Sequence, residues 1–307
     1  MTDEERMFEC IPNFSEGRRP EVLEALRRAA EVPGVRVLGL DADPDHNRAV
    51  MTLVGPRGSL LTSVFATIRQ ALETIDLTRH EGVHPRMGAV DVVPFVPLQG
   101  SSEAEAIEMA RELGRRVGDE LQVPVYFYEL AATRPERRNL ADVRRGQFEA
   151  LSVRMAADPP DCGPPEPHPT AGAVAIGARR PLIAFNVYLN TGSMAVARRV
   201  AKAVRGSSGG LVGVKALAMD TRNHGRVQVS MNLVDYRTTP LPRALELVRE
   251  EARQLGVLVV QTELVGFMPF DAVEDAMRYY LQLPGFSRHR VLEVAIKESG
   301  KEWGDRE

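Results

Sequence analysis

The chain has 307 residues, of which 44% are hydrophobic and 26% are charged, and its formal net charge is -3. This is the composition of a globular protein, and it excludes a wholly disordered chain, which lacks the apolar surface to offset the entropy of ordering. The slight acidic excess disfavours strong nonspecific binding to nucleic acid, because such binding requires a basic surface. The length suits about two domains of roughly 150 residues each.

The cysteine content and the N-terminus bear on where the protein works. Two cysteines, Cys10 and Cys162, are too few for a disulfide framework or a four-thiolate zinc site, and they indicate a reducing compartment. No run approaches the roughly 18 apolar residues of a membrane helix. The acidic segment 1–6 is not followed by the apolar core of a secretory signal. We therefore expect a cytoplasmic protein that binds neither nucleic acid nor membrane.

Helical and strand-like patterns alternate along the first half of the chain. The spacing of apolar residues predicts helices, and short β-branched runs between them predict strands. In chain order we expect a helix at 20–32, strands at 35–40 and 49–54, a helix at 60–75, a strand at 90–96, a helix at 104–121 and a strand at 123–128. Pro94 lies inside one of these strands, which predicts an edge position or a bulge, because proline lacks the amide donor of the ladder.

A proline-rich stretch at 156–169 interrupts this pattern. Proline fixes φ and removes amide donors, so no regular element is expected there. Two interpretations remain open at this point. The stretch is either a linker between domains or a linker that lines a ligand cleft.

The pattern restarts in the second half. We expect a strand at 182–189, a helix at 194–204, strands at 211–219 and 226–234, a helix at 241–255, a strand at 257–262 and a helix at 272–281. The order strand, helix, strand, strand, helix, strand is that of the split βαβ, or ferredoxin-like, arrangement. The first half has the same order with one added helix and strand.

These orders predict an α/β (α+β) fold of two ferredoxin-like subdomains. The expected boundaries are 1–180, which includes the proline-rich connector 157–172, and 181–300. Each sheet would be covered by helices on one face. The two helix-free faces would then enclose a substrate cleft.

The segment from His80 to Phe95 is the most informative for chemistry. Its first five residues, His-Glu-Gly-Val-His, match the zinc-protease signature in letters. That signature requires a helix, and Gly82 and Pro85 disfavour one, so we expect no metal. A loop histidine that leads into a strand, as His84 does, fits a general base better, because its unperturbed pKa suits proton transfer near neutral pH. A histidine that only caps or packs is the alternative.

Two other polar clusters accompany this segment. Residues 41–48 join two predicted strands and form either a solvated turn or a loop that binds an amine or a carboxylate. Residues 9–17 lead into a helix at a position that suits an anion, without the second glycine and the lysine of a phosphate loop.

Basic residues give further candidates. Arg179 or Arg180, after the glycine-containing segment 172–178, could hold a carboxylate through two hydrogen bonds. That segment precedes a strand instead of opening a helix, so it is not a dinucleotide fingerprint. The pairs Arg137-Arg138 and Arg144-Arg145 are expected on the solvated surface, where an anionic tail of a substrate could use them.

Taken together, several blocks resemble those of the glutamate formimidoyltransferase (formiminotransferase) family in order and spacing. The blocks are 9–17, Asp43 with Asn47-Arg48, Gly55-Pro56, 84–97, 123–126, 177–179, 182–186 and 228–233. The resemblance runs from about residue 8 to residue 270. It is to a single-activity form, without the cyclodeaminase domain of the bifunctional animal enzyme.

The resemblance implies two ferredoxin-like subdomains that face each other across a substrate tunnel. It implies an enzyme that transfers the formimino group from N-formimino-L-glutamate to N5 of tetrahydrofolate in histidine degradation, giving 5-formiminotetrahydrofolate and L-glutamate. Tetrahydrofolate would be a co-substrate, no metal would be required, and the family suggests a homodimer. Two alternatives remain. One is formyl transfer that involves N-formylglutamate or 5-formyltetrahydrofolate, and the other is a non-catalytic folate-binding protein.

The resemblance also assigns site residues. His84 matches the catalytic histidine of the family, and Asp43 matches an acidic residue near the amine chemistry. Arg48 and Arg179 are candidate anchors for substrate carboxylates. The segment that matches the folate-binding segment follows the family only loosely and lacks its aromatic residues. Its members are Gly163, Pro164, Pro165, Glu166, Pro167, His168, Pro169, Thr170, Ala171 and Gly172.

Overall fold

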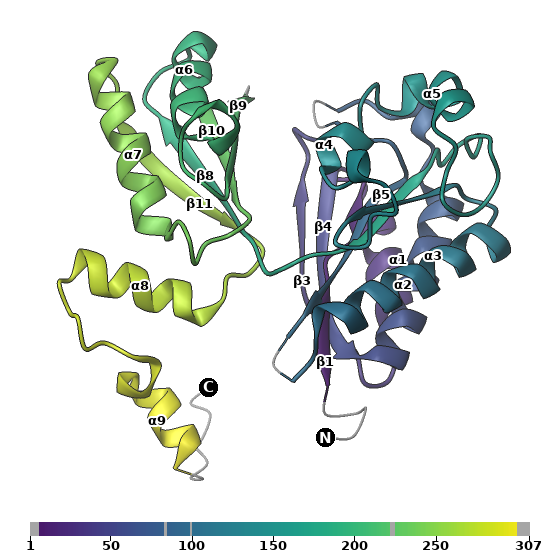
Figure 1. Ribbon diagram of the computed structural model, residues 1–307, viewed down its shortest axis with the longest axis horizontal. Coiled ribbons are helices and arrows are strands. Elements are labelled where there is room, and N and C mark those ends of the chain that lie inside the picture. The colour runs from purple at the N-terminus through teal and green to yellow at the C-terminus, as the bar shows by residue number, and fades with distance from the viewer. Residues whose placement is uncertain (1–5, 83–84, 99, 222–224, 300–307) are drawn as a thin grey trace. The chain divides into compact units, whose positions relative to one another are not determined.

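The computed structural model describes residues 6–82, 85–98, 100–221 and 225–299. The chain divides into two compact units, residues 1–180 (unit 1) and 181–307 (unit 2). Each unit is a mixed α/β structure with its own sheet (Figure 1). The predicted two-subdomain α/β fold is confirmed, whereas the placement of the two sheets across a cleft stays a prediction.

Unit 1 combines a split βαβ order with two added parallel strands. Its strands are β1 (Met7–Cys10), β2 (Asn13–Phe14), β3 (Arg36–Asp43), β4 (Arg48–Pro56), β5 (Val90–Pro97), β6 (Val125–Glu129) and β7 (Val174–Ala178). Its α-helices are α1 (Pro20–Ala30), α2 (Arg57–Thr74), α3 (Glu103–Glu120), α4 (Leu140–Val143) and α5 (Leu151–Ala157). β1 and β2 lie between β4 and β5, β3 lies outside β4, and β7 and β6 continue in parallel beyond β5.

Strand β5 lies inside this sheet, with β1 and β2 on one side and β7 on the other. Of the two positions predicted from Pro94, an edge strand or a bulge, the edge is therefore wrong, whereas the register between β2 and β5 does shift near this point. The neighbouring strand is interrupted at Ile11 and Pro12, and the Ile11 N–H donates to the Pro94 carbonyl over 3.2 Å. The pairing of β2 with β5 is already irregular near this point. The amide that Pro94 lacks therefore does not interrupt a regular hydrogen-bond ladder.

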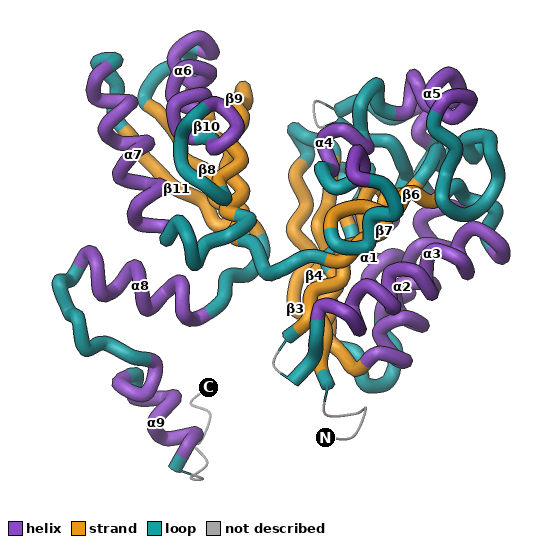
Figure 2. The backbone as a smooth tube through the Cα atoms, in the orientation of Figure 1, coloured by secondary structure: helices purple, strands orange, loops and turns teal. Residues whose placement is uncertain are grey.

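Helices α1, α2 and α3 cover one face of the unit 1 sheet (Figure 2). Phe8, Leu53 and Leu113 are fully or almost fully buried in the core beneath them. The N-terminus of α3 is fixed by a capping box, in which Ser102 and Glu105 exchange side-chain and backbone hydrogen bonds. Helix α3 can be predicted from the sequence because it has a buried apolar face and a capping box at its N-terminus.

The other face of this sheet is partly covered as well. Val143 of α4 and Leu151 of α5 pack with Tyr126 and Tyr128 of β6 in a second apolar cluster. The expectation that helices would cover only one face is therefore wrong for the β6–β7 side of the sheet. The short apolar runs of α4 and α5 give too few turns for a helical period to stand out.

Strand β7 is absent from the sequence prediction. Its residues are mainly alanine and glycine, which have low strand propensity, and it becomes a strand because it is buried on both faces. Gly177 leaves room for a neighbour, since a Cβ there would lie 2.6 Å from the Tyr128 ring. The proline-rich connector joins α5 to β7 within unit 1, so it does not join the two units.

Unit 2 is a four-stranded antiparallel sheet with the split βαβ element order. Its elements are β8 (Ile183–Leu189), α6 (Met194–Val204), β9 (Val214–Thr221), β10 (Arg226–Leu233), α7 (Leu241–Gln254), β11 (Val259–Val265), α8 (Phe270–Tyr280) and α9 (Leu292–Glu298). The strand order is β11-β8-β10-β9. Apolar side chains of α6 and α7 bury one face of this sheet. Every element of unit 2 except α9 lies where the sequence predicts it, with boundaries that differ by a few residues.

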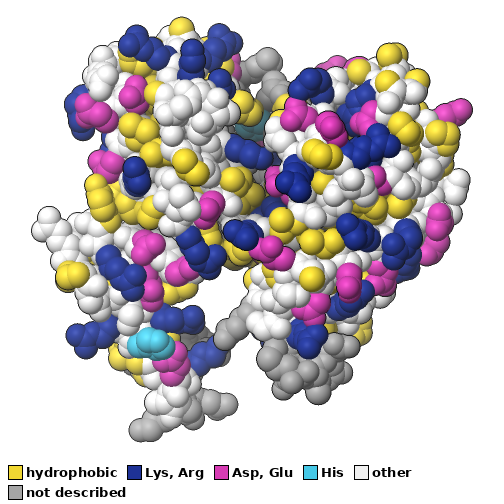
Figure 3. All heavy atoms as spheres, viewed as in Figure 1, with side chains coloured by type: hydrophobic (Ala, Val, Ile, Leu, Met, Phe, Trp, Pro, Cys, Tyr) yellow, Lys and Arg dark blue, Asp and Glu magenta, His cyan; other side chains and the backbone are white. Residues whose placement is uncertain are grey.

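The surface and the cysteines agree with the composition. In the view of Figure 3, basic and acidic side chains are interspersed on both units, as the near-balanced charge of the sequence suggests. Cys10 and Cys162 are free thiols. Among the helices of the described residues, none is both long and apolar enough to cross a membrane.

Candidate functional site

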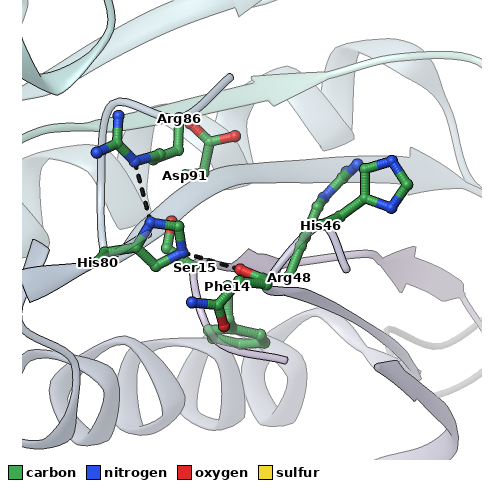
Figure 4. A pocket seen from close by; sticks show the side chains of 8 residues that line it. Phe14, Ser15, His46, Arg48, His80, Arg86 and Asp91 are labelled. Atoms are coloured by element: carbon green, nitrogen blue, oxygen red, sulfur yellow. Dashed lines mark hydrogen bonds between the residues drawn. The ribbon is translucent and has the colours of Figure 1, made fainter. Parts of the chain in front are cut away.

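A small polar pocket lies at one end of the unit 1 sheet, where the loops next to β2, β4 and β5 meet. Because β2 lies between β4 and β5, residues that are distant in the sequence come together there. The lining residues are Phe14, Ser15, His46, Asn47, Arg48, His80, Arg86 and Asp91 (Figure 4). Four of these eight side chains are histidine or arginine.

The turn between β3 and β4 contributes Asp43 and His46. The Asp43 carboxylate accepts the backbone N–H groups of Asp45 and His46 over 2.9 and 3.0 Å, which closes the turn. It also contacts Nδ1 of His46. Burial alone would raise the pKa of Asp43, but the hydrogen bonds from His46 outweigh it and lower this pKa below its ordinary value.

The Asp43–His46 pair has the residue types needed for proton transfer. A carboxylate only accepts hydrogen bonds, so the Nδ1 that it contacts carries a proton. The resemblance placed Asp43 near the amine chemistry and made His84 the catalytic histidine, which lies outside the described residues. Among the described residues, the histidine that Asp43 contacts is His46, and the Asp-x-x-His spacing was the signal for it.

Asn47 ties this turn to two other segments. It adopts a φ of 48°, in the left-handed region where Asn is better tolerated than most residues. Its Oδ1 accepts the Gly17 N–H over 3.0 Å, and its Nδ2 donates to the Glu81 carbonyl over 2.9 Å. The predicted turn is therefore a turn that also lines the pocket, and Asn47 holds it against the segments that contain Gly17 and Glu81.

His80 is fixed at both ring nitrogens. Nε of Arg86 donates to Nδ1 over 3.1 Å, and because arginine has no acceptor, Nδ1 is unprotonated and Nε2 donates to the Asn47 carbonyl over 2.9 Å (Figure 4). Arg86 is buried and also forms two hydrogen bonds with Glu149, of 3.0 and 2.7 Å. Sequence reasoning did not assign a role to His80 or Arg86.

The zinc-protease interpretation gains nothing from this geometry. His80 follows a short 3-10 turn, and none of residues 80–82 or 85–86 is helical. Within the part of the chain that the structure describes, no three His, Cys, Asp or Glu side chains are arranged to hold a metal ion.

Asp91 and Arg144 form a buried ion pair beside Arg48. Oδ1 of Asp91 accepts the Met87 N–H over 2.9 Å, and Oδ2 pairs with Arg144. The Arg144 side chain is only 15% exposed, so its predicted place on the solvated surface is wrong. No local pattern indicates this ion pair, because the two partners are 53 residues apart.

Arg48 is the predicted carboxylate anchor that reaches this pocket. Burial and then the charge of Arg144 lower the pKa of Arg48, the carboxylates of Asp91 and Asp43 raise it, and the net pKa is about 10. A guanidinium with this pKa is still charged at neutral pH. With Arg86 and Arg144 nearby, the pocket favours an anionic ligand group.

Arg179 lies elsewhere on the sheet. Its N–H donates to the Phe95 carbonyl over 3.0 Å, which places it about 13 Å along β5 from Asp91. Its charge acts on Glu9: burial raises the pKa of Glu9 and Arg179 lowers it, with a net rise. The structure therefore does not bring Arg48 and Arg179 into one pocket.

The predicted folate segment 163–172 reaches the pocket region at one end only. The carbonyls of Thr170 and Ala171 accept the N–H groups of Leu77 and Ala89 over 2.7 and 3.0 Å, so this end packs against the segments that carry His80 and Arg86. The other end lies beside α3, where Gly163 has a φ of 82°. Burial lowers the pKa of His168, which closes the turn between these ends.

The protein is therefore a two-subdomain α/β protein. Unit 1 carries, at one end of its sheet, an arginine-lined pocket that favours an anion. The model of the formiminotransferase domain, N-terminal subdomain, matches residues 7–179, and that of the formiminotransferase domain matches residues 184–301. The chain therefore belongs to the formiminotransferase family, as the resemblance of its motifs predicts.

Curated relatives match over most of the chain. It is similar to a glutamate formimidoyltransferase of Thermoplasma acidophilum, at 46% identity over 95% of this chain and 98% of the relative. It is also similar to a glutamate formimidoyltransferase of Streptococcus pyogenes serotype M1, at 43% identity over 94% of this chain and 97% of the relative. A formimidoyltransferase-cyclodeaminase of Mus musculus is 40% identical over 90% of this chain, which spans 52% of that relative.

Proposed function

We propose that the protein transfers the formimino group from N-formimino-L-glutamate to N5 of tetrahydrofolate, as in histidine degradation. The observation that carries this proposal is the near full-length match, at 43 and 46% identity, to two relatives named glutamate formimidoyltransferase. The products are 5-formiminotetrahydrofolate and L-glutamate. Tetrahydrofolate is a co-substrate, and the chemistry does not require a metal.

The reaction needs proton transfer at two nitrogens. N5 attacks the amidine carbon, a tetrahedral intermediate forms, and glutamate leaves through its amine. A base takes the N5 proton, and an acid returns a proton to the leaving nitrogen. We assign this role to His84, in the segment that leads into β5, with Asp43 as the carboxylate that stabilises the cationic amidinium. Positioned proton transfer of this kind contributes about 10²–10⁴-fold to the rate.

Both substrates carry carboxylates, and the arginines of unit 1 suit them. Arg48 is the anchor proposed within the pocket, where its charge persists at neutral pH. Arg179 is the anchor proposed further along the sheet, which matches an extended substrate better than a single compact one. The segment 163–172 is the proposed folate contact, and its packing against the pocket segments supports this at Thr170 and Ala171. We also propose that the protein is a homodimer and works in the cytoplasm.

Turnover with defined donors tests the proposal. Absorbance-monitored reactions would use tetrahydrofolate with formiminoglutamate, and N-formylglutamate as a parallel donor. We expect formimino transfer by the wild type, with a loss of about 10²–10⁴-fold in His84→Ala and a large loss in Asp43→Asn. Asp41→Asn is the matched control, because it removes an exposed carboxylate from the same strand.

The outcomes separate the alternatives. Turnover with the formyl donor alone would replace the proposed substrate. Wild-type rates in His84→Ala would refute the proposed base. Folate binding without turnover of either donor would identify a binding protein.

A further inference from the structure

Three uncharged donors converge on one carboxylate oxygen in unit 2. Asn186 Nδ2, Tyr188 Oη and Gln228 Nε2 lie 3.0, 2.9 and 3.5 Å from Oε2 of Glu263. These residues come from β8, β10 and β11 and alternate with Val187 and other side chains buried beneath α6 and α7. They therefore stand on the opposite face of the sheet.

Glu263 has a fixed position but no compensating charge. None of the Lys and Arg side chains that the structure describes lies within ion-pair distance of it, and no described residue donates a hydrogen bond to its Oε1. An exposed carboxylate is well solvated by water and needs no protein donors. Three donors, of which Gln228 is only 3% exposed, instead hold this one in a single orientation.

The rest of this sheet face changes from polar to apolar across the strands. Glu263 pairs with Asn186, which pairs with Ser230, which pairs with Leu217. Leu217 is an exposed apolar side chain, and Met219 stands two residues further along the same strand. The row spans three strand spacings, or about 14 Å. A flat ligand with N–H donors at one edge and an apolar body fits such a surface.

We propose that Glu263, held by Asn186 and Tyr188, binds the N–C–N edge of a planar amidine-type group. One N–H of the ligand would bond to Oε1. The second would replace Gln228 at Oε2, since that contact is the longest of the three. Two adjacent N–H donors match the two oxygens of a carboxylate, as in arginine–carboxylate pairs.

Two sources of this chemistry occur in the proposed reaction, and to that extent the inference rests on the proposed function. The formimino group of the donor is an amidine, and the pterin ring of tetrahydrofolate carries a 2-amino-pyrimidinone edge. The motif 182–186 contains Asn186, and the motif 228–233 contains Gln228, so two sequence blocks without an assigned role gain one.

Direct binding to the full chain tests the inference. Titration calorimetry under anaerobic conditions would compare wild type and Glu263→Gln with four probes: tetrahydrofolate, its 2-desamino analogue, formiminoglutamate and N-formylglutamate. We expect the variant to bind one ligand that has the N–C–N edge about ten- to a hundredfold more weakly. Its counterpart without that edge should bind equally well to both proteins.

The comparison among the four probes identifies which ligand supplies the N–C–N edge. Weaker binding of tetrahydrofolate alone assigns the pterin edge, and weaker binding of formiminoglutamate alone assigns the amidine. Asn186→Ala, which keeps the carboxylate, should weaken the same ligand by a smaller factor, and thermal unfolding of each variant checks its fold. Asp220→Asn is the matched control, because Asp220 is four residues from the buried Ala216 and pairs with the buried Val227, so it lies on the helix-covered face of the sheet and not on that of Glu263.

Unchanged affinity for both ligands in a folded Glu263→Gln would overturn the inference. So would equal weakening of each ligand and of its counterpart without the N–C–N edge. The proposed function is judged separately, by wild-type turnover. Binding that depends on Glu263 without turnover would support the inference and refute the proposed function.

Discussion

Arg86 donates from Nε to Nδ1 of His80 over 3.1 Å, so an arginine fixes the tautomer of a histidine in the pocket. The remaining guanidinium nitrogens of Arg86 bind Glu149, in the connection between α4 and α5. A chain of hydrogen bonds thus runs from Asn47 through His80 and Arg86 to Glu149. It joins the β3–β4 turn to a segment about a hundred residues later, and the pocket lies along it.

Arg86→Gln should weaken this connection. The variant loses the paired hydrogen bonds to Glu149 and leaves Nδ1 of His80 without its donor. Hydrogen bonds to charged groups contribute about 1.5–3 kcal/mol, and the exposure of Glu149 favours the lower end. Urea unfolding at pH 7 measures the free energy of unfolding.

Arg79→Gln is the control for this measurement, because its side chain is exposed and its ion pair with Asp76 is long. We expect it to change the free energy of unfolding by less than about 0.5 kcal/mol. Equal stability of the Arg86 and Arg79 variants would show that the chain of hydrogen bonds contributes nothing.

Gly17→Ala should distort the turn that carries Asp43 and Arg48. A Cβ at Gly17 would lie 2.4 Å from the Asp43 carbonyl oxygen and 2.6 Å from the Arg48 nitrogen, and both are backbone atoms of the sheet. Overpacking of this kind costs about 1–3 kcal/mol. Thermal unfolding would detect it, and turnover should fall as well because both proposed site residues move.

Gly58→Ala provides the opposite control. Nothing lies within 4 Å of a Cβ built there, and the residue is in the first turn of α2. Removing conformational freedom from the unfolded chain should stabilise this variant by about 0.4–1 kcal/mol. A Gly17→Ala protein as stable as Gly58→Ala would contradict the close approach.

Glu16 should contribute stability that depends on pH. Its buried carboxylate accepts the N–H groups of Arg18 and Arg19 over 2.8 and 2.9 Å, at the start of α1. Burial raises the pKa of Glu16, but these hydrogen bonds and the Arg19 side chain outweigh it, and the net pKa lies below the ordinary 4.5. Ionised Glu16 therefore stabilises the fold fully above pH 4.5, and this contribution disappears as the pH falls through the lowered pKa.

The corresponding measurement is urea unfolding of wild type and Glu16→Gln from pH 7 down to pH 3.5. We expect a deficit of about 1 kcal/mol in the variant at pH 7, which shrinks below pH 4.5. Glu73→Gln removes an exposed carboxylate and should show no such trend. A deficit that stays constant over the whole range would mean that the charge of Glu16 is irrelevant.

Most of the fold follows from local pattern. α6 extends from Met194 to Val204 as the sequence predicts, because its apolar residues repeat at helical spacing and Ser193 caps its start. Strand β7 cannot be predicted in this way, since its two alanines and one glycine have low strand propensity and the segment is a strand only through burial on both faces. Pro94 misleads for a related reason: whether a strand is interior depends on a neighbour whose interruption the sequence does not reveal.

The site is less readable than the fold. Asp43 and Arg48 could be selected from a polar turn, because both lie in one short segment. The contacts of Arg86 with Glu149 and of Arg144 with Asp91 join residues more than fifty positions apart. Only the sheet order and the packing of α4 bring them together. Local spacing therefore reports which residues are chemically capable, while tertiary structure decides which of them meet.

Arg144 and Arg145 offer the sharpest comparison, because the sequence treats these neighbours alike and the structure separates them. Arg144→Met would leave the buried Asp91 carboxylate with the Met87 N–H and the field of Arg48 alone. Loss of one partner from a buried ion pair costs roughly 3–5 kcal/mol, and the remaining contacts favour the lower end.

Arg145→Met removes a side chain that is 79% exposed and that, among the residues the structure describes, pairs with Asp142 within its own short turn. An exposed pair of this kind contributes about 0–1 kcal/mol, so we expect little change. Urea unfolding of both variants at pH 7 makes the comparison. A loss of stability in Arg144→Met no greater than in Arg145→Met would mean that Asp91 is satisfied without Arg144, and that the ion pair does not hold α4 and the connection after it against β5.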